Sequence, residues 1–297
     1  MGRVVIGFDG TDRAEDALTF GVRLAAATGD VPEVVTVYPA SPAGEGHVDA
    51  EWVAAMREQA EHMLDRARAL HGEPAIEYRV VGAGSAAHGL ANVAEDLEAT
   101  TIVLGSGRRG TLRRTALGST PERLLHGTLT PVTVVPRGYR STEHGPVQVI
   151  GCAFVDTPDG HEALRAAADL ARRAGGRLRV FTVVAPVAEF STFVAPDTEQ
   201  TFTDAARAAY QRALDAAVAA VAAVAETVPT TGELLEGRVA EALAALDSRD
   251  VDLLVCGSRR YGPVRRVLLG GTSSRLVRMA ASPVMMVPRS GDPGRTV

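Results

Sequence analysis

Gly105-Ser-Gly-Arg-Arg-Gly-Thr-Leu-Arg-Arg-Thr-Ala-Leu-Gly-Ser-Thr120 is the stretch that decides the fold. The apolar run Thr101–Leu104 before it has the pattern of a buried strand, and Pro121–Thr128 after it has that of a helix with a proline in its first turn. A glycine at the strand exit permits positive φ and a close approach of backbone. Gly118-Ser119-Thr120 then precedes the helix, where free N–H groups and the helix dipole attract anions. The stretch therefore predicts a phosphate cradle.

The same pattern occurs a second time in the chain. Gly257-Ser-Arg-Arg-Tyr-Gly-Pro-Val-Arg-Arg-Val-Leu-Leu-Gly-Gly-Thr272 repeats it at an offset of 152 residues (257 − 105). A chain of 297 residues suggests about two domains, and internal repetition indicates two copies of one domain. The polar, turn-rich segment Arg137–Gly145 is the expected linker, which gives domains over 1–140 and 145–290.

Short apolar strands alternate with helical patterns in both halves, which predicts an α/β fold with a mainly parallel sheet. In the first half we expect strands over Arg3–Phe8, Glu33–Tyr38, Ile76–Val81, Thr101–Leu104 and Pro131–Pro136, with helices over Ala14–Thr28, Ala50–Leu70, Ala86–Glu98 and Pro121–Thr128. In the second half we expect strands over Val147–Val155, Arg177–Val184, Glu233–Glu236, Asp252–Cys256 and Pro283–Pro288, with helices over His161–Ala174, Asp204–Thr227, Val239–Asp247 and Thr272–Ala281.

Composition narrows the classes of function. The net charge of −5 argues against a nucleic-acid partner, which usually meets a basic surface. All 31 basic residues are arginine, so Walker A and Schiff-base lysine chemistry are excluded. No signal-peptide pattern is visible, and the apolar helix around Ala213–Ala225 is shorter than a membrane span. We expect a cytoplasmic protein without a membrane partner, in which Cys152 and Cys256 are buried thiols.

Enzyme chemistry finds no support in the sequence. There is no Gly-x-Ser-x-Gly elbow and no paired Cys/His nucleophile with an orienting group. The seven histidines do not form a metal-binding set. The segment Gly82–Ala87 superficially matches a dinucleotide fingerprint, but it follows the third strand of its half rather than the first, so we expect a plain turn. These observations favour a protein that is not an enzyme.

The chain resembles a tandem universal stress protein, with two such domains in one polypeptide, from about Arg3 to Arg289. The resemblance rests on Asp9-Gly10-Thr11 after the first strand, on the glycine loop, and on Thr130-Pro-Val-Thr-Val-Val-Pro136 with its copy Ser282-Pro-Val-Met-Met-Val-Pro288. It implies two doubly wound five-stranded parallel sheets, Rossmann-like and similar to the adenine nucleotide alpha hydrolases. It also implies an internal pseudo-dimer that pairs Val132–Val135 with Val284–Val287, and it leaves open a homodimer of chains.

Some members of this family bind ATP, and the resemblance implies which residues here would do so. The binding subset carries Gly, two residues, Gly, nine residues, Gly and then Ser or Thr, with an acidic residue after the first strand and backbone groups at the end of the second. In the first half this implies a site made of Asp9, Gly10, Val37, Leu104, Gly105, Gly107, Arg108, Gly118, Ser119 and Thr120. In the second half it implies Gly257, Arg260, Gly270, Gly271 and Thr272.

The match departs from the family pattern at defined positions. Arg108 and Arg260 stand where the second glycine belongs, and each could either block phosphates or offer them a guanidinium fork. The acidic position of the second half is Val155, with Asp156 shifted by one residue, so the first half is the better candidate.

Three hypotheses follow. The first is a stress protein that binds ATP, with Mg²⁺ entering only with the nucleotide, and that acts through nucleotide-dependent interactions. The second is an interaction module without nucleotide, and the third is a weak ATP hydrolase or nucleotidyltransferase.

Overall fold

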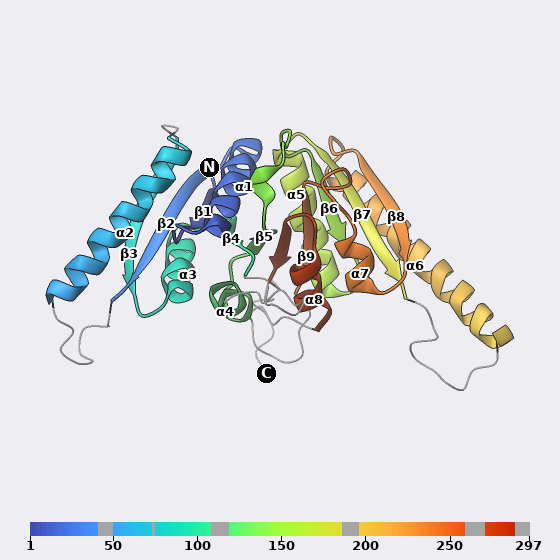
Figure 1. The fold of residues 1–297 in the computed structure, drawn as a ribbon. Coiled ribbons are helices and arrows are strands. Elements are labelled where there is room, and N and C mark those ends of the chain that lie inside the picture. The colour runs from blue at the N-terminus through green and yellow to red at the C-terminus, as the bar shows by residue number, and fades with distance from the viewer. Residues whose placement is uncertain (41–49, 73–74, 108–118, 186–195, 259–270, 289–297) are drawn as a thin grey trace, which may run out of the picture. The chain divides into compact units, whose positions relative to one another are not determined.

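The structure, a computed structural model, describes residues 1–40, 50–72, 75–107, 119–185, 196–258 and 271–288. The described chain separates into two compact units, which we call unit 1 (Met1–Pro146) and unit 2 (from Val147 onward). Figure 1 colours unit 1 from blue to green and unit 2 from yellow-green to red.

Each unit alternates strands and helices. Unit 1 contains the strands β1 (Arg3–Gly7), β2 (Val31–Pro39), β3 (Glu77–Ala83), β4 (Thr101–Gly105) and β5 (Val132–Val135), the helices α1 (Asp12–Thr28), α2 (Ala50–Leu70), α3 (Ala86–Asp96) and α4 (Ser119–Gly127), and the short 3₁₀ helix η1 (Tyr139–Ser141). Unit 2 contains the strands β6 (Val149–Ala153), β7 (Arg177–Val184), β8 (Thr230–Glu236), β9 (Leu253–Gly257) and β10 (Val284–Val287), and the helices α5 (Pro158–Arg173), α6 (Pro196–Val224), α7 (Val239–Ala244) and α8 (Gly271–Met279).

The strand order is the same in the two units. It runs β3-β2-β1-β4-β5 in unit 1 and, starting from the edge strand β8, β8-β7-β6-β9-β10 in unit 2. All neighbouring pairs within a unit are parallel. The direction in which successive strands are added reverses between β1 and β4 in unit 1 and between β6 and β9 in unit 2. Ligands of open α/β sheets bind at the carboxyl ends of the strands around such a point. The expected fold class, two doubly wound parallel-sheet domains, is confirmed.

Apolar side chains on both faces of each sheet form the cores, as expected for parallel strands covered by helices. Right-handed crossovers place α1 and α2 on one face of the first sheet and α3 and α4 on the other. The largest fully buried side chains are Ile6, Leu18, Phe20, Leu24, Leu64, Ile102, Leu124 and Leu125 in unit 1, and Ile150, Leu178 and Phe181 in unit 2.

Most predicted elements are present, and the differences lie at their ends. The helix expected from Asp204 begins at Pro196, inside a segment predicted as a loop, and the helix expected from His161 begins at Pro158. Both prolines occupy first-turn positions, where proline lacks only an N–H that the helix would leave unbonded. The strand expected over Glu233–Glu236 runs from Thr230, because Thr230 and Thr231 pair with β7. The turn expected over Gly82–Ala87 is shorter than predicted: β3 runs to Ala83, and Ser85 is the N-cap of α3, which begins at Ala86.

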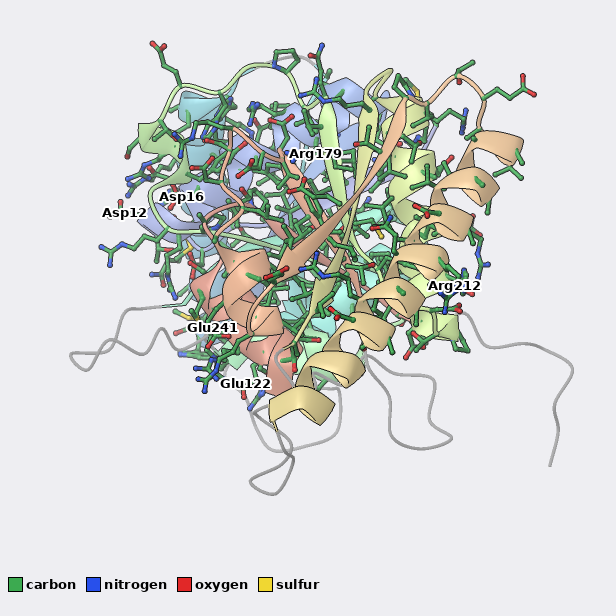
Figure 2. The ribbon with its side chains drawn as sticks, turned by 90° about the vertical axis from the view of Figure 1, so that its right-hand side faces the viewer. Asp12, Asp16, Glu122, Arg179, Arg212 and Glu241 are labelled. Carbon is green, nitrogen blue, oxygen red and sulfur yellow. The ribbon has the colours of Figure 1, made fainter. Side chains whose placement is uncertain are left out.

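The segment after β5 is fastened to α1 by a polar network. Asp16, which is almost fully buried, accepts hydrogen bonds from the backbone N–H groups of Gly138 (2.8 Å) and Arg140 (3.0 Å). The guanidinium of Arg140 also binds Asp12 at 3.0 Å and the carboxylate of Glu15. Asp12 and Asp16 both lie on α1 (Figure 2), and hydrogen bonding from Arg140 lowers the pKa of the Asp12 carboxyl. The first turns of α1 therefore anchor residues 138–140 within unit 1.

Candidate functional site

Unit 1 has a cleft of about 300 Å³ at the carboxyl ends of β1, β2 and β4. It lies where the strand order predicts a binding site, and the first turns of α1 and α4 border it. The lining residues are Gly7, Phe8, Asp9, Thr11, Arg13, Ala14, Val35, Thr36, Val37, Met63, Ala86, Leu90, Leu104, Gly105, Ser119, Thr120 and Pro121.

The turn between β1 and α1 presents a carboxylate to this cleft. Thr11 is the N-cap of α1, and its hydroxyl accepts a hydrogen bond from the N–H of Ala14. The same threonine donates its own N–H to Asp9 at 3.2 Å, which fixes the carboxylate beside the helix start. The side chain of Asp9 is 62% exposed, so solvent or a ligand can reach it. Gly10 adopts the left-handed region (φ 73°) that this turn requires, but it does not line the cleft.

The end of β2 offers backbone polar groups on the same side. Strand β1 pairs with β2 only as far as Gly7 and Val35, and the N–H of Phe8 donates to the Val35 carbonyl at 2.9 Å. Because alternate residues of a strand direct their N–H and C=O to the same neighbour, Val37 directs both groups to the β1 side, past the last register pair. The Thr36 hydroxyl donates to the Phe8 carbonyl at 2.9 Å and closes the end of this ladder.

Gly105 ends β4 in close contact with the first turn of α1. A Cβ atom on Gly105 would lie 2.1 Å from the carbonyl oxygen of Arg13, a distance that no side chain tolerates. Gly105 does not adopt the positive φ that a glycine permits, since the positive-φ glycines of the described chain are at other positions. The close approach is real, but the approaching group is the backbone of α1. Gly105 therefore lets α1 and β4 meet at the floor of the cleft.

The structure brings most of the predicted first-half residues together. Six of them line the cleft, namely Asp9, Val37, Leu104, Gly105, Ser119 and Thr120. Ser119 and Thr120 form the start of α4, as the predicted anion-binding helix start requires. Gly107 is buried and does not line the cleft, while Arg108 and Gly118 lie outside the described residues.

Sequence reasoning missed several residues of the cleft. Met63 of α2 and Leu90 of α3 supply apolar surface from elements distant in the sequence, and Ala86 begins α3 beside them. Arg13 was also missed, although it stands four residues after Asp9 and an i,i+4 spacing brings helical side chains together. Its guanidinium lies 3.7 Å from the Asp9 carboxylate.

Unit 2 repeats the framework of this region with different side chains. The Phe154 N–H donates to the Phe181 carbonyl at 2.8 Å, and the Thr182 hydroxyl donates to the Phe154 carbonyl at 3.0 Å. Val155, 37% exposed, occupies the place of Asp9, as the sequence predicted. Asp156, which precedes α5, instead lies 2.8 Å from His161 in the first turns of that helix. Gly271 and Thr272 begin α8, Gly257 ends β9, and Arg260 and Gly270 lie outside the described residues.

Both cysteines are buried free thiols on adjacent strands of unit 2, as predicted. Burial raises the pKa of Cys152 well above its ordinary value and raises that of Cys256 to about 12. Within the described residues, no group of three or more His, Cys, Asp or Glu side chains is placed to hold a metal ion. Across those residues, too, no helix combines the length and the apolarity that crossing a membrane would need.

The comparisons with known proteins agree with the observed fold of two repeated domains. The profile described as universal stress protein family matches residues 1–136 and again 147–288. A universal stress protein of Mycobacterium tuberculosis is 33% identical over 206 residues, which are 69% of each chain, and one of Mycobacterium bovis matches equally.

Solved structures show the same fold over nearly the whole chain. A universal stress protein from Archaeoglobus fulgidus superimposes with a TM-score of 0.65 at 19% identity, covering 97% of this chain and 96% of its own. A putative universal stress protein from Pseudomonas aeruginosa gives a TM-score of 0.59 at 14% identity, covering 97% and 93%. With two matches to the family profile and the repeated α/β units, the chain belongs to the universal stress protein family and carries two of its domains in tandem.

Proposed function

We propose that this chain binds an adenine nucleotide, ATP or a close relative, in the cleft of unit 1, and that the bound nucleotide sets its interactions with other proteins. The observation that carries the proposal is the convergence of six predicted ligand residues, from four separate segments, on one cleft. Its volume of about 300 Å³ is at the lower end of the range of about 300 to 1,000 Å³ that is usual for small-molecule sites.

The lining residues fit the three parts of a nucleotide. Met63, Leu90 and Leu104 offer apolar surface for a purine, beside the backbone groups of Val37 that can pair with its edge. The exposed carboxylate of Asp9 suits the two ribose hydroxyls, since a carboxylate accepts hydrogen bonds at both oxygens. Magnesium would enter only with the phosphates, because the described residues hold no metal-binding cluster of their own.

The phosphates would lie toward the start of α4. The N–H groups of a first helical turn have no partner within the helix and point along its dipole toward an anion. Ser119 and Thr120 line the cleft at this place, and Thr120 is only partly exposed. Nothing in this arrangement requires a reaction: it contains hydrogen-bond partners and apolar surface, and a binding role needs no more.

The test is thermal unfolding of the protein in the presence of ATP. A ligand at one hundred times its Kd stabilises the folded state by about 2.7 kcal/mol, so the proposal predicts a rise in Tm with added ATP. Ala86→Phe, which fills the cleft, is expected to abolish the rise, and Ala26→Phe on the exposed side of α1 is the matched control. If ATP shifts Tm neither in the natural chain nor in the control, the protein is an interaction module without nucleotide.

Pairing of the two domains through their fifth strands stays a prediction from the family resemblance, as does a homodimer of chains. Val134 and Met286 occupy equivalent positions of β5 and β10. Replacing both with aspartate is expected to separate or unfold the halves, which small-angle scattering would detect. An unchanged compact particle would contradict the pairing.

A further inference from the structure

Arg13 lines the cleft, and among the described residues most of the hydrogen-bond donors of its guanidinium have no partner. Within the described part of the chain, the one ion pair of its guanidinium is with Asp9, at 3.7 Å. That separation is longer than a hydrogen bond, and a guanidinium carries five N–H donors. By contrast, the guanidinium of Arg140 is bound to both Asp12 and Glu15 of the same helix end.

Arg13 also breaks the local rule for its position. It is the second residue of α1, after the N-cap Thr11 and Asp12, where the helix dipole favours negative charge. The neighbouring charges of this turn, Asp12 and Glu15, follow the rule. A residue that breaks a local preference and, among the described residues, has no side-chain partner at hydrogen-bond distance is the kind that binding sites contain.

The backbone of Arg13 is held in place by the floor of the cleft. Its carbonyl packs against Gly105, so the residue is fixed where β4 ends. Its side chain is 32% exposed and faces the Asp9 carboxylate, which also lines the cleft. From this place a small rotation moves the guanidinium between Asp9 and a ligand that enters the cleft.

We infer that Arg13 binds the phosphate end of the ligand and thereby makes the site selective for phosphorylated adenine compounds over adenosine. The inference rests on the proposed function and names which part of the ligand this residue reads. In the free protein Arg13 balances the charge of Asp9. With ligand bound, its donors pair with phosphate oxygens, and the Asp9 carboxylate becomes available to neutral hydroxyl groups.

Unit 2 supplies an internal contrast at the equivalent position. Asp159 packs against Gly257 as Arg13 packs against Gly105, with an ideal Cβ of Gly257 at 2.4 Å from the Asp159 carbonyl. It is likewise the second residue of its helix, after the N-cap Thr157 and Pro158. The cation of unit 1 is thus an acidic residue in unit 2. The side chain at this position attracts an anion in unit 1, where it is Arg13, and repels an anion in unit 2, where it is Asp159.

The experiment measures the affinities of adenosine, AMP, ATP and inorganic tripolyphosphate for the natural chain, Arg13→Ala and Arg13→Lys by isothermal titration. Because Arg13→Ala removes a charge-assisted contact, we expect it to weaken the binding of ATP and of tripolyphosphate roughly 10- to 100-fold. The affinity for adenosine should change by less than about twofold. The affinity of Arg13→Lys for ATP should lie between those of the natural chain and Arg13→Ala, since lysine keeps the charge and loses the bidentate guanidinium. Arg57→Ala, on the exposed surface of α2, makes the same change of net charge and should alter none of the four.

Each other outcome has a defined meaning. An equal loss for adenosine and ATP would overturn the inference, because Arg13 would then act only by orienting Asp9. Unchanged ATP and tripolyphosphate binding in Arg13→Ala would also overturn it. If the natural chain binds tripolyphosphate through Arg13 but shows no preference for adenine compounds, the assignment of Arg13 to phosphate stands and the proposed function fails. Binding of neither ATP nor tripolyphosphate by the natural chain would refute both.

Discussion

The two units share a skeleton and differ at the rim of one cleft. Each ends its first ladder with a threonine hydroxyl on a phenylalanine carbonyl, at 2.9 Å from Thr36 and 3.0 Å from Thr182. Each starts its first helix with a threonine N-cap, Thr11 or Thr157. The charges that a nucleotide would meet are not shared. The comparison separates residues that build the fold, which both units contain, from residues that suit a ligand, which unit 1 alone has at these places.

A second contrast concerns charge inside the sheets. In unit 1 the almost fully buried carboxylate of Glu33 on β2 binds Arg79 on β3, and in unit 2 the guanidinium of Arg179 on β7 binds Glu233 on β8 at 2.8 Å (Figure 2 labels Arg179). Equivalent strand pairs of the two units thus carry an ion pair, with the acidic and basic partners exchanged between the strands. Neighbouring strands need complementary charge here, and either direction satisfies them.

The largest effect should come from replacing the two glycines that let the last residue of β4 or β9 contact the first helix of its unit. Gly105→Ala places a Cβ atom 2.1 Å from a backbone carbonyl, and Gly257→Ala places one at 2.4 Å. Each should lower the free energy of unfolding of its own unit by roughly 3 kcal/mol or more, measured by urea denaturation. Only Gly105→Ala should also abolish ATP binding. Gly127→Ala, which meets nothing within 4 Å, is the control, and equal stability of all three variants would disprove the packing role.

The next-largest effect should be a loss of stability at alkaline pH that is confined to unit 2, because both cysteines lie in that unit. Their pKa values in the folded state are raised above the ordinary 9.0, to about 12 for Cys256. A thiol with a raised pKa stays protonated when folded and ionises when unfolded, so its stabilising contribution is complete below pH 9 and falls as the pH rises toward 12. The loss should be about 1.4 kcal/mol per pH unit for each thiol.

Urea denaturation between pH 8 and 11, followed by thiol labelling to report the opening of unit 2, measures this slope. The double variant Cys152→Ala and Cys256→Ala should lose the part of the slope that the thiols cause. An identical pH dependence in that variant would show that other groups are responsible.

The smallest effect should come from the two helix caps. Thr11→Ala and Thr157→Ala each remove a side-chain acceptor from the start of a helix, which costs about 1 kcal/mol of stability. Thr11→Ala should in addition weaken ATP binding, because the Thr11 hydroxyl also donates a hydrogen bond to the Asp9 carboxylate. A Thr11→Ser variant should restore both properties. If Thr157→Ala weakened ATP as strongly, the assignment of the site to unit 1 would be wrong.

Much of the fold could be predicted from the sequence because period, repeat and turn residues agree with one another. The strands of unit 1 were found within a few residues, and Gly29 closes α1 in the left-handed conformation, as its position predicts. The early start of α6 was missed although Pro196 is a normal first residue of a helix. The strand at Thr230 was missed because its pairing with β7 is a tertiary contact that local composition does not show.

Several residues of the candidate site were predicted from the sequence, but the contacts that build the site were not. Asp9, Val37 and Ser119 line the cleft as expected. The close backbone approach at Gly105 was expected, but its partner was not, because α1 lies far from Gly105 in the sequence. Arg13 could have been found by aligning the two halves, since an offset of 146 residues sets it against Asp159 and exposes the reversal of charge.

The most direct test of the account is the number of ATP molecules bound per chain, measured by isothermal titration on nucleotide-free protein. The account predicts one ATP per chain. It also predicts that Asp9→Ala abolishes this binding while Asp156→Ala in unit 2 leaves it intact. Two ATP molecules per chain, or one that survives Asp9→Ala, would contradict the claim that the difference between the two units decides where the ligand binds.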